Sequence, residues 1–449
     1  MRLSIRTFVA SLALSSVALS AELSEQLTNW KTLPAAEQSS LAEQLNGKRF
    51  SKLSAEERLT VQKKCVALSG DLIGRAANGK LKKVKDELPK LILKVAGDYL
   101  ANTPPAETPA HPKAEELYGS IPDDAARINR LVSIDPTSER WHSTGLYAAP
   151  GEVVKLKFPK QWVGKNLSVQ LSGHRDQISL KKNLERLPKS PARSFKVDQE
   201  VIEVASAFGG AIYIDTGDKP QQKPSFPVAI KNALEAPYFV LGKSSVEEWK
   251  EKGRQAPAPY AELVTPRVAL SFPSAWIREM EDPTALLEYW DKVVQLHDEL
   301  GGLSKIRTMP ERVNVDVQIS NGLFHAGYPM QGPQQHCKGV VDLEALKSGG
   351  NWGWFHELGH EAQRRPDKAW SWNNAYTFDG SIECTVNLFS AHAFNRLGIT
   401  PRGGWSWTAD PKQVDARAKK ALATGKGYPE LGVGDKLAMF LQIRDEFGW

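Results

Sequence analysis

Hydrophobic residues change their spacing along this 449-residue chain, and the change limits what the chain can fold into. From about Leu23 to Leu100, apolar residues sit among charges at helical spacing, and Ser54 to Glu57 has the form of a capping box. Closely spaced prolines follow and oppose both helix and strand. Apolar and polar residues then alternate, as in half-buried strands. The sequence therefore predicts several domains rather than one core.

The alternating segments are short and separated by glycines. Residues 154–158, 167–171 and 211–214 are examples, and such spacing favours a β-sandwich. Farther along, the sequence predicts a helix from Asp282 to Gly302 and a strand from Val313 to Ile319. The predicted fold class is α+β and multidomain: a helical domain (21–102), a Pro-rich linker (103–118), a β-sandwich (119–235) and an α/β domain (236–449).

The first twenty residues have the form of a secretory signal peptide. Basic residues Arg2 and Arg6 precede an apolar stretch from Phe8 to Leu19 that is too short to span a bilayer comfortably. Small residues at Ala18 and Ser20 place cleavage after Ser20. We expect a secreted or periplasmic protein without a membrane anchor; an uncleaved N-terminal anchor is the alternative reading.

The net charge of +6 is modest for this length and does not imply a nucleic-acid partner. The lysine-rich stretch from Lys80 to Lys85 is interpreted as the solvated face of a helix. Three cysteines allow at most one disulfide within the chain. A bridge between Cys337 and Cys384 and free buried thiols are both open, and none of the three is assigned as a nucleophile.

One segment carries recognisable chemistry. His356 and His360 are four residues apart, so on a helix they share a face and can bind one metal ion. Glu357 follows the first histidine and can act as general base toward a water molecule. A second helix begins near Ser381 and carries Glu383 in its first turn, where it completes a three-ligand zinc site. The alternative for Glu383 is a plain acid at a helix N-terminus.

Asn387 lies one turn beyond Glu383 and is a candidate hydrogen-bond partner for a ligand, or else a surface amide. His325 and Tyr328 lie on a loop where either could donate a hydrogen bond to the oxyanion, or simply belong to a turn. Six tryptophans surround the metal motif, and indoles suit both core packing and stacking on sugars. We expect Trp370 or Trp372 to face the cleft, because their loop joins the two ligand helices.

These stretches resemble the M60 (enhancin-like) metallopeptidases. The resemblance rests on His356-Glu357-Leu358-Gly359-His360 with Gln363, on Gly380 to Glu383, and on Asn387 to Ser390. Residues 143–152 and 325–330 are also similar to the family. The resemblance implies a β-sandwich before a gluzincin-type catalytic domain, with His356, His360 and Glu383 as zinc ligands and Glu357 as general base. It also implies cleavage of mucin-like O-glycoproteins, as in many members.

The sequence therefore predicts an exported endopeptidase that holds one Zn²⁺ and hydrolyses proteins by Glu357-assisted attack of zinc-bound water. The resemblance implies that these proteins are O-glycosylated mucin-like glycoproteins. An alternative is a glycan- or mucin-binding protein with an inactive metal site. Retention of Glu357 argues against it, because a purely structural zinc needs no base. A peptidase indifferent to glycans is a third reading.

Overall fold

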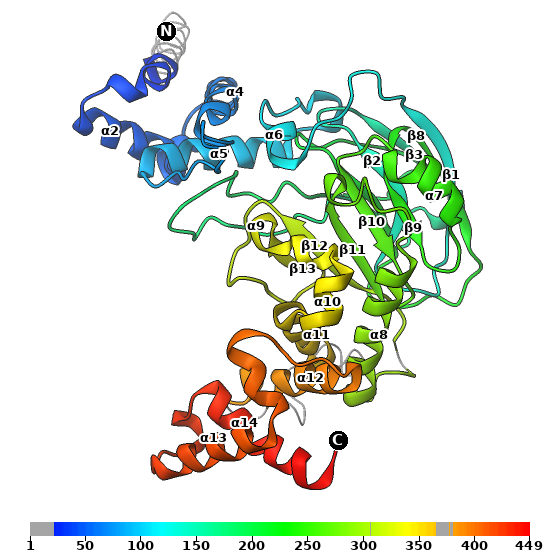
Figure 1. Ribbon diagram of the computed structural model, residues 1–449. Helices are drawn as coiled ribbons and strands as arrows, with labels where there is room; N and C mark the ends of the chain where they lie inside the picture. Colours follow the sequence, from blue (N-terminus) through cyan, green and yellow to red (C-terminus); the bar gives the residue numbers. More distant parts are fainter. Residues whose placement is uncertain (1–21, 306, 365–376, 378–379) are drawn as a thin grey trace, which may run out of the picture. The chain divides into compact units, whose positions relative to one another are not determined.

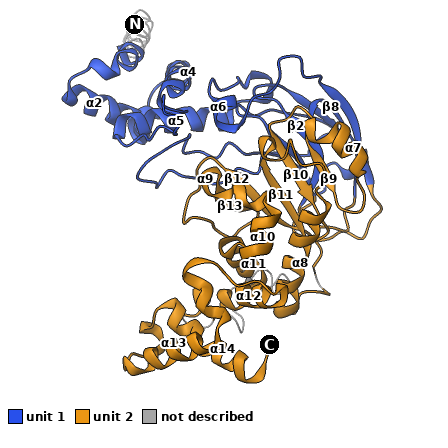
Figure 2. Ribbon diagram, in the orientation of Figure 1, with its two compact units in different colours: residues 1–134, 141–215, 226–235 blue, residues 135–140, 216–225, 236–449 orange. Residues whose placement is uncertain are grey.

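The computed structural model describes residues 22–305, 307–364, 377 and 380–449 (Figure 1). They form two compact units (Figure 2). Unit 1 contains residues up to 134 together with 141–215 and 226–235, and unit 2 contains 135–140, 216–225 and 236–449. The predicted signal peptide, residues 1–20, lies outside the described residues. No described helix is long and apolar enough to cross a membrane.

Unit 1 begins with helices, as predicted. After a helical stretch at 22–28 and the turn η1 (Trp30–Thr32) come α2 (Ala35–Leu45), α3 (Gly47–Phe50), α4 (Ala55–Leu72) and α5 (Glu87–Asn102). The capping box opens α4: Ser54 Oγ accepts from the Glu57 N–H, and the Glu57 carboxylate accepts from the Ser54 N–H at 2.7 Å. α4 and α5 contact each other and bury apolar side chains, among them Val61 and Ile92.

The lysine-rich stretch is not helical, so its interpretation as a helix face is wrong. Residues 73–86 connect α4 and α5 and form two isolated antiparallel bridges, Arg75 with Leu81 and Val84 with Leu184. Gly74 and Gly79 adopt positive φ angles of 99° and 74°. Side chains of L-residues disfavour that backbone, so these two glycines end the helical path despite the helical spacing of the sequence.

The proline-rich stretch 103–118 contains two short helical turns, η2 (Pro105–Glu107) and α6 (Ala114–Tyr118). The prolines were predicted to oppose helix, and helical turns nevertheless form at these two places. Pro105 lies in the first turn of η2, where its missing N–H needs no partner, and α6 starts after Pro112.

Eight strands follow, and all their pairings are antiparallel. The main order is β5-β4-β7-β2-β8-β3-β6, with β1 also on β8. Both halves contribute to one buried core, so the sheet folds over itself as the predicted sandwich. The strands are β1 (Ile128–Ile134), β2 (Trp141–Ala148), β3 (Val154–Lys157), β4 (Ser168–Leu171), β5 (Arg193–Lys196), β6 (Val201–Val204), β7 (Gly210–Asp215) and β8 (Phe226–Glu235).

Strand β8 belongs to both halves of the sandwich. Its end pairs with β2 through Leu234 and Glu235, and its earlier residues pair with β1 and β3. Between them, Asn232 has φ 64° at an irregularity in the register with β1, and its side-chain amide donates to the Val153 carbonyl at 2.8 Å. Asn tolerates this left-handed backbone better than most residues, which lets β8 change direction there.

The sheet of unit 2 has the order β13-β12-β11-β10-β9, with β10 and β11 antiparallel and the other neighbours parallel. β12 ends at Asp316, not at Ile319 as predicted. The Asp316 carboxylate accepts from the Val317 N–H at 2.6 Å and so occupies a donor that the ladder would need. The strands are β9 (Tyr238–Val240), β10 (Tyr260–Val264), β11 (Val268–Pro273), β12 (Glu311–Asp316) and β13 (Met330–Pro333).

Helix α8 (Thr284–Gly301) packs on this sheet, with Gly302 at φ 69° after its last turn as predicted. It also contacts the two helices of the candidate site, α11 (Trp352–Arg364) and α12 (Ile382–Leu397). The remaining helices of unit 2 are α7 (Val246–Glu251), α9 (Gln334–Cys337), α10 (Leu343–Gly349), α13 (Pro411–Ala423) and α14 (Val433–Phe447). A large apolar core joins the sheet, α8, α11 and the end of α12.

All three cysteines are buried free thiols, so the proposed bridge between Cys337 and Cys384 is absent. Cys337 and Cys384 pack in different hydrophobic clusters of unit 2. Burial raises the pKa of the Cys384 thiol to about 11, so it stays protonated near neutral pH.

Candidate metal centre

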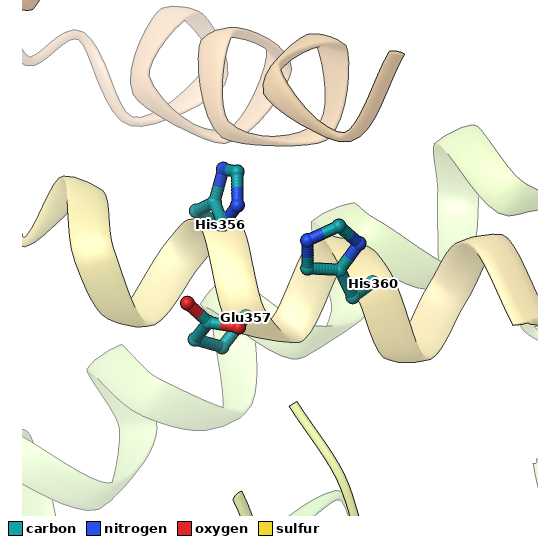
Figure 3. A group of neighbouring side chains, drawn as sticks. All are labelled: His356, Glu357 and His360. Carbon is teal, nitrogen blue, oxygen red and sulfur yellow. The ribbon is translucent and has the colours of Figure 1, made fainter. Parts of the chain in front are cut away.

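Helix α11 presents His356, Glu357 and His360, as the four-residue spacing predicts (Figure 3). Its Trp354, Phe355 and Leu358 point into the core of unit 2 and fix the rotation of the helix. The ligand-type atoms of the three polar residues all lie within 4.8 Å of one another. Helix packing therefore turns the polar face of α11 toward one common point.

Glu383 of α12 reaches both histidines. Its Oε2 lies 3.2 Å from His356 Nε2 and 3.5 Å from His360 Nε2. In a tetrahedral zinc site with bonds of about 2.0–2.1 Å, two ligand atoms are separated by about 3.3–3.4 Å. Both distances from Glu383 Oε2 are therefore close to the separation of two ligand atoms in such a site.

Asn387 fixes the proton on His356. The Asn387 amide nitrogen donates to the Glu383 carbonyl at 2.7 Å, so its Oδ1 is the acceptor. That oxygen lies 2.9 Å from His356 Nδ1 and accepts from Trp352 Nε1 at 3.0 Å. Nδ1 of His356 must then carry hydrogen, which leaves Nε2 for a metal. Asn387 is buried and is not a surface amide.

Gln363 plays the same part for His360. Its amide nitrogen donates to the Ile382 carbonyl and to Thr385 Oγ1, at 3.0 and 2.8 Å, so its Oε1 accepts from His360 Nδ1 at 2.9 Å. Gln363 is fully buried. It also ties α11 to the first turn of α12, next to Glu383. The motif alone gave no physical role to Gln363, because the two groups that orient its amide, Ile382 and Thr385, lie on the second helix.

The donor set fits a cation. Two imidazole nitrogens with lone pairs and one carboxylate oxygen would repel at these distances unless a proton or metal ion lay between them. The pKa of Glu383 is well below its usual range because His356 and His360 donate hydrogen bonds to it. Burial lowers the pKa of His356, but hydrogen bonds with Glu383 and Asn387 outweigh this and raise it. A metal ion would compete with that proton.

Replacing Asn387 with Ala is expected to weaken zinc binding about 10- to 100-fold, the usual cost of losing such a partner. The change leaves two half-buried donors, His356 Nδ1–H and Trp352 Nε1–H, without their acceptor. Asn387→Asp keeps an acceptor oxygen and should retain most of the affinity. Competition with a chromophoric chelator measures both, and an unchanged affinity in Asn387→Ala would contradict the role.

Gly359 sets the distance between the two helices. A Cβ atom at this position would lie 2.9 Å from Val386 Cγ2 and 3.0 Å from the Val386 carbonyl oxygen on α12. Real Cβ atoms rarely come so close, so only glycine lets α12 pack here and bring Glu383 to the histidines.

Gly359→Ala is expected to lower the free energy of unfolding by about 1–3 kcal/mol through overpacking. It should also weaken zinc binding, since α12 must move away together with Glu383. Thermal unfolding with and without zinc measures both effects. Gly339→Ala is the matched control, because a Cβ there meets no atom within 4 Å. Equal behaviour of the two variants would show that the close approach is unimportant.

Glu357 is buried beside the proposed ligands. Burial raises the pKa of its carboxyl above the usual range, although the charges of His356, His360 and His325 partly oppose this. A base whose pKa moves toward the working pH exchanges protons more effectively. A proton acceptor with a raised pKa, Glu357, therefore lies next to the proposed ligand atoms of His356, His360 and Glu383.

The loop before β13 carries His325 and Tyr328 and is held from several sides. The Glu361 carboxylate accepts from the Gly327 N–H at 2.6 Å, which ties the loop to α11. Arg312 Nε donates to the Tyr328 hydroxyl at 3.1 Å, and Arg140 lies over the Tyr328 ring. His325 Nδ1 lies 2.9 Å from the Ala326 carbonyl. An oxyanion role for either residue stays a prediction.

The tryptophans near the motif divide between core and surface. Trp354 is fully buried and Trp407 nearly so, whereas Trp352 and Trp405 are half-buried and stack with ring centroids 4.4 Å apart. Trp352 also supports Asn387, which sequence reasoning missed because the contact joins residues 35 apart. Trp370 and Trp372, predicted to face the cleft, lie outside the described residues.

His297 is buried on α8. Its two ring nitrogens lie 2.8 Å from the carbonyls of Val293 and Phe355. It therefore links α8 to the backbone just before His356 and does not join the three converging atoms.

Two family models together match residues 123–449. Residues 232–449 match the model of peptidase M60, enhancin and enhancin-like, and residues 123–231 match the N-terminal domain of M60-like peptidases. A relative in Xenopus laevis, named TRPM8 channel-associated factor homolog, is 34% identical over 321 residues, which is 71% of this chain and 34% of the relative. The chain thus spans about a third of the length of the named relatives it matches.

Solved structures share the fold. A functionally unknown conserved protein from Bacillus anthracis is 22% identical, with a TM-score of 0.55 over 71% of this chain and 64% of that chain. The structure of IMPa from Pseudomonas aeruginosa in complex with an O-glycopeptide is 15% identical, with a TM-score of 0.54 over 94% of this chain and 51% of that chain. The two family models and the shared fold lead to one conclusion. This chain belongs to the M60 (enhancin and enhancin-like) peptidase family.

Proposed function

We propose that the protein is a zinc-dependent endopeptidase that cleaves glycoproteins of the O-glycosylated, mucin-like kind. The observation that carries the proposal is the convergence of Glu383 Oε2 with His356 Nε2 and His360 Nε2, at 3.2 and 3.5 Å, beside the buried carboxyl of Glu357. A metal site that only stabilised the fold would need no such base.

Each residue of the site has a separate role in the proposed reaction. His356, His360 and Glu383 hold the ion, with Asn387 and Gln363 keeping hydrogen on the outer nitrogen of each imidazole. One zinc ion, when bound, would polarise the scissile carbonyl and lower the pKa of a nearby water molecule. Glu357 takes a proton from the attacking water and passes it to the leaving amine as the C–N bond breaks. His325 or Tyr328 is proposed to donate to the oxyanion.

The substrate class rests on the family and on one neighbour. The resemblance implies glycoprotein substrates, and the IMPa structure was solved with an O-glycopeptide. Exposed flat aromatic surface suits sugar rings, and the proposed Trp370 and Trp372 belong to the segment between α11 and α12. The N-terminal signal-peptide pattern supports action outside the cytoplasm, in the periplasm or beyond the cell.

A matched pair of substrates tests the glycan requirement. Zinc-loaded protein is incubated with an O-glycosylated mucin and with the same mucin stripped of its sugars. The proposal expects new peptide termini from the glycosylated form alone, none from Glu357→Gln and none after chelation. Cleavage of both forms would leave a peptidase that does not read glycans, and cleavage that survives chelation would overturn the zinc mechanism.

A second candidate is a binding protein without hydrolytic activity. It is favoured by the names of the relatives at 30–34% identity, which describe association with the TRPM8 channel and not proteolysis. On this reading the metal centre would shape a protein- or glycan-binding surface. Retention of mucin on the protein without any new peptide termini, at full zinc occupancy, would favour this candidate.

A further inference from the structure

Positive charge is concentrated in one part of unit 1. Residues 52–94 contain eleven Lys and Arg against five Asp and Glu, and residues 175–189 contain five against two. The two stretches together carry an excess of nine positive charges, whereas the whole chain carries six. The remainder of the chain is therefore slightly acidic. Neither stretch of charge contributes to the candidate metal centre.

The fold brings the densest parts of these stretches together. Val84 and Leu184 form an antiparallel bridge, and the two backbones exchange hydrogen bonds of 2.8 and 2.9 Å there. Lys90 Nζ donates to the Lys182 carbonyl at 2.6 Å. We call the result the lysine surface; it consists of Lys80, Lys82, Lys83, Lys85, Lys90, Lys181 and Lys182.

The geometry directs these charges outward. Val84 is buried, so the alternation of side chains along an extended backbone turns Lys83 and Lys85 to the opposite, exposed side. Lys80 and Lys182 are also exposed. Within the described part of the chain, the ion pair that this surface forms is a long one, Lys83 with Glu185 at 3.7 Å. Such pairs are weak, so most of the positive charge faces solvent.

We propose that the lysine surface binds an acidic polysaccharide, a chain that carries sulfate or carboxylate groups at regular intervals. Lysines two apart on an extended backbone are about 6.5–7 Å from each other, so several can meet successive anions on one flexible chain. Lysine offers a mobile point charge without the rigid fork of arginine, which suits charge-dense partners of variable geometry. The attraction is long-ranged and depends on ionic strength.

Other polyanions fit less well. Single-stranded nucleic acid is usually held by aromatic side chains that stack on bases, and residues 80–90 and 178–185 contain none. Binding to an anionic bilayer usually also needs apolar side chains that enter the membrane. Residues 80–90 and 178–185 offer one exposed large apolar side chain, Leu180, and no aromatic residue. Acidic glycans also occur on glycoproteins, so this surface would add to substrate capture, but the proposal does not depend on peptidase activity.

Heparin, a sulfated polysaccharide, is the probe, and neutral dextran is its control. The full-length protein is compared with two variants that each lose four positive charges. One changes Lys80, Lys83, Lys85 and Lys182 to Gln, and the other changes Lys157, Lys165, Lys196 and Lys231, which are exposed on the sandwich. We expect the wild-type protein to bind heparin in a salt-sensitive way and not to bind dextran. The affinity for heparin should be at least tenfold lower in the first variant and within twofold of wild type in the second.

Several outcomes would overturn the proposal. The wild-type protein does not bind heparin, or heparin binding is weakened equally in the two variants. A third such outcome is that the first variant binds heparin as the wild-type protein does but no longer binds phosphatidylglycerol vesicles. Thermal unfolding shows whether the first variant is folded. If it is not, a variant with Arg at the same four positions keeps the positive charges, and the proposal requires that this variant binds heparin. Chelation and Glu357→Gln are expected to leave heparin binding unchanged, so failure here is distinguishable from failure of the proposed peptidase.

Discussion

Glu357→Gln is expected to reduce peptide hydrolysis about 100- to 10,000-fold, the range that one general acid–base residue contributes. Glutamine has nearly the size of glutamate but cannot accept a proton from water. The side chain is buried and burial raises the pKa of its carboxyl, which makes proton exchange more effective than at a surface carboxylate. The measurement is kcat/KM on an O-glycopeptide that the wild-type protein cleaves.

The control for this variant is its zinc content. The proposed ligands are His356, His360 and Glu383 and do not include Glu357, so Glu357→Gln should bind zinc as the wild-type protein does. Zinc binding with lost hydrolysis separates the base from the ligands. A variant that retained wild-type kcat/KM would show that proton transfer at Glu357 is not part of the reaction.

Removal of the metal is expected to have the second large effect. If zinc is present at about a hundredfold excess over its Kd, it stabilises the folded protein by about 2.7 kcal/mol. For a domain of this size, that corresponds to about 5–10 °C in Tm. A chelator should therefore lower the Tm of the wild-type protein, and His360→Ala should abolish the zinc-dependent difference together with activity.

His392→Ala is the matched control for His360→Ala. Both histidines are buried, His392 on α12 and His360 on α11, but His392 lies beside Arg396 and Trp449. Its loss should lower Tm with and without zinc and leave the difference between them intact. A zinc-dependent shift of wild-type size in His360→Ala would place the ion elsewhere.

The sequence was sufficient to predict the elements with strong periodicity. The capping box at Ser54, the helix that Gly302 terminates and the strands of the sandwich all follow from local patterns. The connection at 73–86 was not predictable in this way, because its apolar spacing is helical and two glycines with positive φ decide the backbone. Its pairing partner, Leu184, is a hundred residues away.

In the candidate site, too, the features that depend on local sequence were predictable and those that depend on distant contacts were not. The spacing of His356 and His360 indicates a metal, since it depends on one helix. The acceptors that set their tautomers, Asn387 and Gln363, are oriented by contacts between two helices, and only Asn387 was a candidate from the sequence. The role of Gly359 depends on the distance to Val386, which no local pattern contains. Long-range packing thus determines how well the motif can bind an ion.

The most direct test of the account is mass spectrometry of an O-glycopeptide after incubation with stoichiometrically zinc-loaded protein, beside the same amount of Glu357→Gln. The account predicts two new peptide products with the wild-type protein, each with a hydrolysed backbone terminus, and intact substrate with the variant. Intact substrate in both samples, at one bound zinc per chain, would contradict the claim that this metal centre is a peptidase site.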